Sequence, residues 1–216
     1  MTSPTKCAGA GRIAAAALTA ALVGSIFAGR AGAVLASPQD SVRSFYNVLL
    51  ATMRNGRSLG QSGRYAALAP AVNGVFDVPL MARLAVGPAW AGLSPVQQQQ
   101  IIAAFGRYVS ATYADRFDSY SGQQLQVTGA EPYAAGVIVE TRIVDPGADP
   151  VNINYLMRRN GDAWQIADVY LDGTISQLAT QRSEFQSILA RQGVDGLIMA
   201  LNRKVDLLTS DAAKSP

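Results

Sequence analysis

The chain has 216 residues, with 18 lysines and arginines against 15 aspartates and glutamates, no histidine and a single cysteine, Cys7. The lack of histidine excludes Ser–His–Asp and Cys–His catalysis, and together with the single cysteine it excludes a Cys/His zinc site. Carboxylate chemistry is the enzymatic route that remains, and a lone cysteine can form no internal disulfide.

The N-terminus has the pattern of a secretion signal peptide. Lys6 and Arg12 precede an unbroken run of small and apolar residues from position 13 to 28, and Val34-Leu35-Ala36 then has the small-x-small spacing that signal peptidase requires. Ala31-Gly32-Ala33 is a second candidate cleavage site. An uncleaved membrane anchor is the alternative, but the run is shorter than the ~20 residues that span a bilayer.

Cleavage after Ala36 would change the charge of the protein. All fifteen acidic residues lie after this position, whereas Lys6, Arg12 and Arg30 leave with the signal, so fifteen residues of each sign remain. No surplus of positive charge is then left for binding nucleic acid. We therefore expect a periplasmic protein that binds no nucleic acid. Its expected segments are a signal peptide over residues 1–36, a single domain over 37–208 and a disordered tail over 209–216.

The first predicted helix spans residues 37–57. Ser37 can cap it, and Gly56 favours its end. A short helical stretch over 64–72 is expected next, disturbed by Pro70. The apolar stripe of the first helix consists of Val42, Phe45, Tyr46, Leu49, Leu50 and Met53.

Two further helices are predicted before the chain changes character. Asp77 can cap the first of them, whose apolar residues are Leu80, Met81 and Leu84. Ser94 and Gln97 form a capping box that opens the second, which reaches about Phe117. Its broad apolar stripe consists of Ile101, Ile102, Phe105, Tyr108, Val109, Thr112 and Tyr113.

The period of the apolar residues then changes from 3.6 to 2. Leu125 and Val127 alternate with polar residues, Asn160-Gly161 is a hairpin signal, and an apolar segment over 164–171 follows it. Three or four consecutive antiparallel strands are predicted, each with one face towards solvent. The residues expected to share the inner face of the two middle strands are Val137, Val139, Thr141, Ile143, Val151, Ile153, Tyr155 and Met157.

The helical period returns after the strands. Ser183 and Gln186 form a second capping box, so a helix is expected to begin there and to end at Gly193. A last apolar stripe runs from Leu197 to Leu208. Helices, then strands, then helices predict an α+β fold in which an antiparallel sheet of about four strands is covered by several helices.

Two stretches of the chain carry a family resemblance. The first is Phe76–Arg83 (FDVPLMAR), which leads into the long aromatic helix, and the second is Trp164–Val169 (WQIADV), followed by Asp172–Ser176 (DGTIS). Together they resemble the periplasmic lipid-binding proteins of the MlaC, or toluene-tolerance, family. The likeness covers nearly all of residues 37–208 and keeps their order. A branch of this family, the hopanoid-associated HpnM proteins, is also similar.

The resemblance implies an NTF2-like fold with an apolar cavity between sheet and helices, which holds the acyl chains of a phospholipid or a hopanoid. It implies a carrier without cofactor, metal or catalytic role. Its partners would be an outer-membrane lipoprotein complex and an inner-membrane ABC transporter with its MCE-domain protein. The residues expected to line the cavity are Leu80, Met81, Leu84, Phe105, Val109, Tyr113, Val137, Val139, Ile143, Ile153, Tyr155 and Met157.

Other interpretations remain open at this stage. A packed core has the same sequence pattern as a cavity wall. Asp168 and Asp172 lie at the end of a strand and in the following turn, so a small enzyme that uses Asp168 is the second hypothesis, although turn formation explains both residues more simply. A non-lipid adaptor of a membrane complex is the third. Five tyrosines suit either the cavity mouth or half-buried surface positions: Tyr108, Tyr113, Tyr120, Tyr133 and Tyr155.

Overall fold

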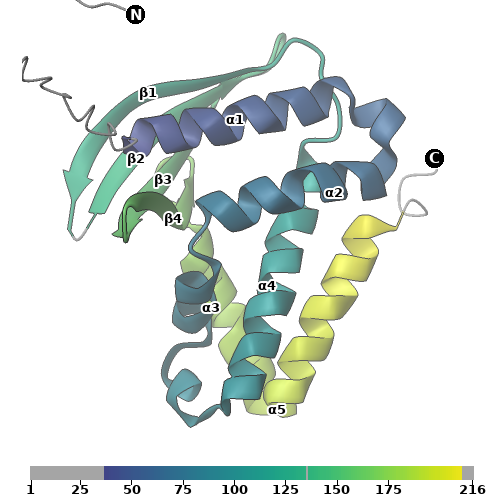
Figure 1. The fold of residues 1–216 in the computed structure, drawn as a ribbon, viewed down its shortest axis with the longest axis vertical. Helices are drawn as coiled ribbons and strands as arrows, with labels where there is room; N and C mark the ends of the chain where they lie inside the picture. Colours follow the sequence, from purple (N-terminus) through teal and green to yellow (C-terminus); the bar gives the residue numbers. More distant parts are fainter. Residues whose placement is uncertain (1–36, 135, 211–216) are drawn as a thin grey trace, which may run out of the picture. The chain divides into compact units, whose positions relative to one another are not determined.

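The computed structural model describes residues 37–134 and 136–210. The predicted signal peptide and most of the predicted tail lie outside the described residues. Within them, four α-helices and a short 3-10 helix come first, five strands follow and a long helix ends the chain (Figure 1). No helix in these ranges is long and apolar enough to cross a membrane.

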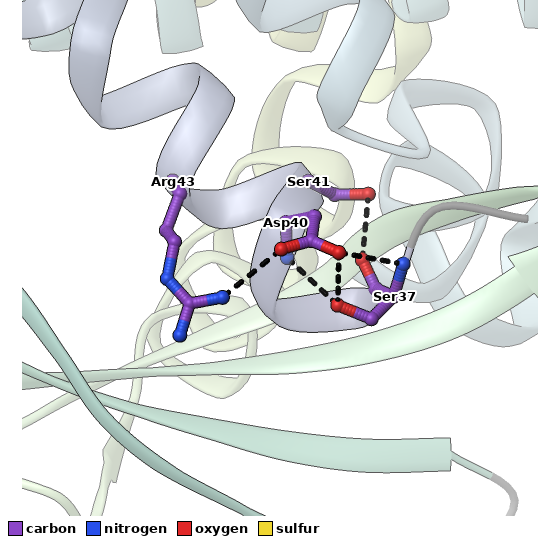
Figure 2. Close-up of polar contacts among 4 residues, drawn as sticks. All are labelled: Ser37, Asp40, Ser41 and Arg43. Carbon is purple, nitrogen blue, oxygen red and sulfur yellow. Dashed lines mark hydrogen bonds and ion pairs between the residues drawn. The ribbon is translucent and has the colours of Figure 1, made fainter. Parts of the chain in front are cut away.

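Helix α1 (Pro38–Arg54) begins at the capping box shown in Figure 2. Asp40 N donates to Ser37 Oγ (3.1 Å), and Ser37 N donates to Asp40 Oδ2 (3.3 Å). Ser37 Oγ also donates to Asp40 Oδ2 (2.7 Å), and the hydrogen bonds from Ser37 to this carboxyl hold its pKa below the usual value. Arg43 Nη1 lies 3.0 Å from Asp40 Oδ1. Both backbone donors are satisfied locally, which confirms Ser37 as the cap.

Helix α2 (Gly56–Val75) is longer than the stretch predicted over residues 64–72. Gly60 has left-handed φ (61°), and Pro70 is accommodated within the helix. The prediction was too short because the buried residues before Leu68 are Gly56, Gln61 and Arg64, none of which is a large apolar residue, so the first turns carry no apolar stripe. The guanidinium of Arg64 donates to the carbonyl oxygens of Gly56 (3.0 Å) and Ala114 (2.9 Å), so the charge is hydrogen-bonded where it is buried.

Helix α3 (Val78–Val86) begins at the predicted cap, because Leu80 N donates to Asp77 Oδ1 (3.1 Å). The backbone N of Asp77 also donates to Ile166 O (2.9 Å), which attaches the start of this helix to the sheet. The 3-10 helix η1 (Gly87–Gly92) leads to α4 (Pro95–Arg116). The capping box of Ser94 and Gln97 is present at the start of α4, as predicted.

The strands form one antiparallel sheet in the order β1-β2-β3-β4-β5. They are β1 (Gln124–Tyr133), β2 (Gly136–Val144), β3 (Val151–Asn160), β4 (Ala163–Leu171) and β5 (Ile175–Ser176). The two-residue β5 is the one strand that the sequence pattern did not indicate. Helix α1 packs against the sheet, as Figure 1 also shows.

Helix α5 (Gln177–Thr209) begins seven residues before the predicted start, since its cap is Ser176 and the predicted cap is Ser183. The expected capping box at Ser183 is wrong, because Ser176 is the cap and accepts a hydrogen bond from Ala179 N (2.9 Å). The expected end at Gly193 corresponds to a non-helical residue (φ 67°) at which the chain reverses. The two arms lie side by side, since Lys204 Nζ on the second is 2.6 Å from Glu184 Oε1 on the first.

Candidate functional site

The twelve residues predicted to line a cavity come from α3, α4, β2 and β3. Leu84 is 39% exposed and lies outside the core. Leu80 and four residues packed against the core are half-buried. The half-buried residues are Leu80, Val109, Tyr113, Val137 and Ile143. The buried ones, all in one apolar cluster, are Met81, Phe105, Val139, Ile153, Tyr155 and Met157.

The inner face of the sheet brings the predicted strand residues together. Val137 pairs with Met157 and Val139 with Tyr155 across β2 and β3. On the other side of β3, Met157 pairs with Ile166 of β4. A continuous wall of aliphatic and aromatic side chains therefore crosses the three central strands, as their alternation predicts.

Aromatic side chains of the helices pack beside this wall. The ring centroid of Phe45 on α1 lies 5.2 Å from that of Tyr113 on α4 and 5.7 Å from that of Phe76. Tyr113 also stacks on Phe117, with centroids 5.6 Å apart. Tyr113 is thus the predicted residue that links α4 to the α1 side of the core.

Four side-chain oxygens meet inside this apolar surrounding, and we call them the hydroxyl cluster: those of Tyr46, Tyr113, Thr141 and Tyr155. Tyr46 Oη lies 2.6 Å from Thr141 Oγ1 and 3.3 Å from Tyr155 Oη. Thr141 Oγ1 donates to the carbonyl of Ile153, and the phenols of Tyr113 and Tyr155 influence each other's pKa. The cluster joins α1, α4, β2 and β3.

Burial dominates the electrostatics of this cluster. It raises the pKa of Tyr46, and it raises the pKa values of Tyr113 and Tyr155 further. The hydrogen bond from Tyr155 offsets part of the effect at Tyr113. All three phenols are therefore neutral at physiological pH, so the cluster offers hydrogen bonds but no charge.

The sequence analysis missed the hydroxyl cluster as a unit. Tyr155 lies in the centre of the core, so its expected place at a cavity mouth or on the surface is wrong, whereas Tyr120 and Tyr133 are exposed. Two signals were available in the sequence. Tyr46 interrupts a buried helical stripe, and Thr141 interrupts an inward strand face, so each needs a polar partner there.

Asp168, the candidate catalytic carboxylate, is buried with 6% exposure. Its Oδ1 accepts hydrogen bonds from Val169 N (2.7 Å) and Leu178 N (3.0 Å), and its Oδ2 accepts one from Ser176 Oγ (2.6 Å). These partners hold β4 to the start of α5. Asp172 lies in the next turn with left-handed φ (49°). No cluster of metal-binding side chains occurs in the described ranges.

Two surface grooves lie apart from the predicted lining. One, of about 490 Å³, runs between α1 and α2 and is mostly apolar, with Val48, Ala51, Leu59 and Ala67 in its walls. The other, of about 720 Å³, lies between the two arms of α5 and is polar. Neither contains any of the twelve predicted residues.

Comparison with known proteins relates this fold to a family. A phospholipid-binding protein from Ralstonia solanacearum, solved in complex with a phospholipid, is 22% identical. The match covers 81% of this chain and 100% of that chain with a TM-score of 0.71, which shows that the two share the α+β fold. A family model described as "MlaC protein" matches residues 43–203, most of the chain. The resemblance found in the sequence is thereby confirmed, and the chain belongs to the MlaC family.

Proposed function

We propose that this protein is a non-enzymatic lipid carrier that binds the acyl chains of a phospholipid between the inner face of the sheet and the helices. Membership of the MlaC family supports this, as does the phospholipid bound to the protein of the same fold from Ralstonia solanacearum. The observation that carries the proposal is the continuous apolar wall of β2, β3 and β4, packed against aromatic side chains of α1 and α4.

Apolar burial is sufficient for affinity in this proposal. Acyl chains contribute roughly 0.8 kcal/mol for each buried methylene, so one long chain gives on the order of 10 kcal/mol before the losses of ordering and association. Arg64 and Asp168 are the buried charged residues within the described ranges, and both are hydrogen-bonded to structural partners. Neither is needed to hold a lipid.

Binding requires the closed core to open in this scheme. Val139, Tyr155 and Met157 are almost without exposed surface, whereas Val109 and Tyr113 on α4 retain some. A small movement of α4 or α1 away from the sheet would therefore admit a chain along the side of the wall on which Val109 and Tyr113 lie.

The proposal also includes the location of the carrier and the partners with which it exchanges lipid. Residues 1–36 would export it to the periplasm, where it would take up and deliver lipid between an outer-membrane lipoprotein complex and an inner-membrane ABC transporter with its MCE-domain protein. A hopanoid is the alternative cargo, because a polycyclic hydrocarbon would also fit an apolar wall.

Extraction of the purified protein with organic solvent, followed by mass spectrometry, tests the proposal. We expect phospholipid in near-stoichiometric amount. A protein that is folded but lipid-free, and that takes up no lipid from vesicles, would overturn the carrier function. A chemically altered lipid formed during incubation would instead support an enzyme.

A further inference from the structure

The groove between the two arms of α5 is a hollow that the proposed function does not use. The first arm, residues 177–192, and the second arm, residues 194–209, run back along each other after the reversal at Gly193. Near the reversal Gln192 packs against Gly196, a position at which a side chain would clash with it. Further along, Lys204 and Glu184 join the two arms again. The groove that remains has a volume of about 720 Å³.

The first arm turns a polar face towards this groove. A helix that packs against another normally presents an apolar stripe there. In this arm the stripe consists of Ser183, Ser187 and Arg191, spaced four residues apart, and Ile188 is the one apolar residue that the described part of the arm adds to the lining. Small hydroxyl side chains cannot fill the space between two helices, so the arms enclose a groove instead of a packed seam.

The groove is rich in hydrogen-bond donors that have no partner. Arg191 on the first arm and Arg203 on the second both line it and are exposed. Within the described residues, neither guanidinium has a hydrogen-bond or ion-pair partner, and the hydroxyls of Ser183 and Ser187 have none either. Donors on both walls are therefore available to a ligand.

The acidic charge of the groove is already neutralised. Among the described residues, Glu184 is the one acid in the lining, and its oxygens lie 2.6 and 2.7 Å from Lys204 Nζ. The two arginines thus leave the groove with an excess of positive charge. An anion that enters it gains charge partners without breaking an existing ion pair.

We infer that this groove is a binding site for a phosphate group. The oxygens of a phosphate point in tetrahedral directions and can accept from both walls at once, whereas the fork of a single guanidinium already matches a planar carboxylate. The volume lies in the range of about 300–1,000 Å³ that is typical of ligand sites, so it also has room for the polar group that carries the phosphate.

Two kinds of ligand share this chemistry: the head group of a phospholipid at a membrane surface and a soluble phosphate ester. None of the residues predicted to line the lipid cavity lies in the groove. The inference therefore goes beyond the proposed carrier function and does not depend on it.

Titration of the purified protein, followed through its amide chemical shifts by NMR, tests the site. The probes are inorganic phosphate, glycerol 3-phosphate and acetate, at constant pH and at constant ionic strength, because salt screens exposed charges. Both phosphates should shift the amides around Ser187 and Arg203 and should bind more tightly than acetate. Shifts spread evenly over the surface, or acetate that binds as tightly as the phosphates, would overturn the inference.

Matched arginine variants locate the site. Arg191→Gln and Arg203→Gln should each weaken the binding of glycerol 3-phosphate by about 1.5- to 5-fold, the range of an exposed ion pair. Arg57→Gln removes the same charge from an exposed position on α2 and should bind as the wild type does. If all three variants weaken binding equally, the effect is one of net charge and the groove is not a site.

Sedimentation with vesicles distinguishes the two kinds of ligand. Wild type that binds phosphatidylglycerol vesicles but not phosphatidylcholine vesicles, with the binding lost in the double variant of Arg191 and Arg203, would identify lipid head groups as the ligand. Binding of glycerol 3-phosphate without binding of vesicles would identify a soluble phosphate ester. Either result supports the site, whereas a double variant that binds both probes as the wild type does overturns it.

The failure of this inference is distinguishable from failure of the proposed function. Lipid extracted from the double variant should equal that from the wild type, because the acyl chains are proposed to lie against the sheet. A wild type that holds no lipid but binds glycerol 3-phosphate would overturn the carrier function alone. A wild type that holds lipid but binds neither phosphate probe would overturn the phosphate site alone.

Discussion

The contact between α4 and α5 and the contact between α1 and the sheet are packed differently. Between α4 and α5 the rings of Phe105 and Phe185 meet edge to face, with centroids 5.9 Å apart, and polar contacts such as Gln181 with Tyr108 lie at the margin. Between α1 and the sheet, polar groups lie in the middle: Tyr46 and Tyr155 meet in the centre of the core.

This difference indicates that the two contacts have different roles. Interlocked apolar side chains cannot separate without losing many dispersion contacts at once. Hydroxyl contacts can be exchanged for equivalent contacts to a ligand at little cost. The contact between α4 and α5 is therefore suited to serve as a fixed scaffold, and the contact between α1 and the sheet is suited to open in the proposed carrier.

The largest effect is expected in the contact between α4 and α5. Phe185→Ala should lower the free energy of unfolding by about 3–5 kcal/mol, because a fully buried aromatic side chain is lost from a close-packed site. Denaturant unfolding measures this. Met199→Ala on the same helix is the control, since Met199 is 53% exposed and its loss should change stability by less than about 0.5 kcal/mol. Similar losses in the two variants would contradict a rigid helical scaffold.

The sheet side should be selectively sensitive to alkali. Because the pKa values of Tyr46, Tyr113 and Tyr155 are raised in the folded state, the unfolded chain loses these protons first as pH rises above about 10. Their stabilising contribution is complete below that pH and is lost above it.

Each such tyrosine should contribute a slope of about 1.4 kcal/mol per pH unit above pH 10. Tyr155→Phe should flatten the dependence of unfolding free energy on pH by about this amount between pH 10 and 11.5. Below pH 9 the unfolding free energies of the variant and the wild type should change with pH in parallel. Equal slopes in the alkaline range would mean that the Tyr155 phenol is not protected by the fold.

A bulky side chain on α4 should separate binding from folding. Val109→Trp places extra volume where the proposed acyl chain lies, and we expect lipid co-purification to fall about tenfold while the unfolding free energy of the lipid-free protein changes by about 1–3 kcal/mol. Val96→Trp, on the same helix at a position 66% exposed, is the control and should bind lipid normally. Unchanged lipid binding in Val109→Trp would place the cargo elsewhere.

The smallest functional effect is expected at Asp168. Asp168→Asn should lower stability by about 1–3 kcal/mol, because it weakens the hydrogen bonds to Leu178 N and Ser176 Oγ. Lipid transfer between vesicles should stay within about twofold of wild type wherever the variant folds. A turnover product made by the wild type and lost in this variant would establish an enzyme.

Local signals account for the elements that were predicted correctly. The capping box at Ser94 and the cap at Asp77 each depend on residues within one turn, so the sequence contains the whole interaction. The start of α5 could not be found in this way. Ser176 is held at this position by its hydrogen bond to Asp168, which lies eight residues earlier on β4.

The candidate site was likewise predictable where the signal is local, and not where it depends on distant contacts. The alternation of Val137, Val139, Ile153 and Met157 indicated the apolar wall, because side-chain direction in a strand follows from the period alone. The sequence shows that Tyr46 and Thr141 need polar partners, but not which ones, because Tyr46 and Tyr155 are separated by more than a hundred residues. Their contact depends on how α1 crosses the sheet.

The position of β1 at the edge of the sheet has a consequence for solubility. One of its sides pairs with β2, and no other described strand pairs with it. An unpaired edge of ten residues invites pairing with a second molecule. Three features of β1 oppose this: an irregularity between Val127 and Gly129, the charge of Glu131, and Pro132, which has no N–H to donate. If the proposed carrier opens its apolar wall to a lipid, these features of β1 guard it against aggregation through backbone pairing at this edge.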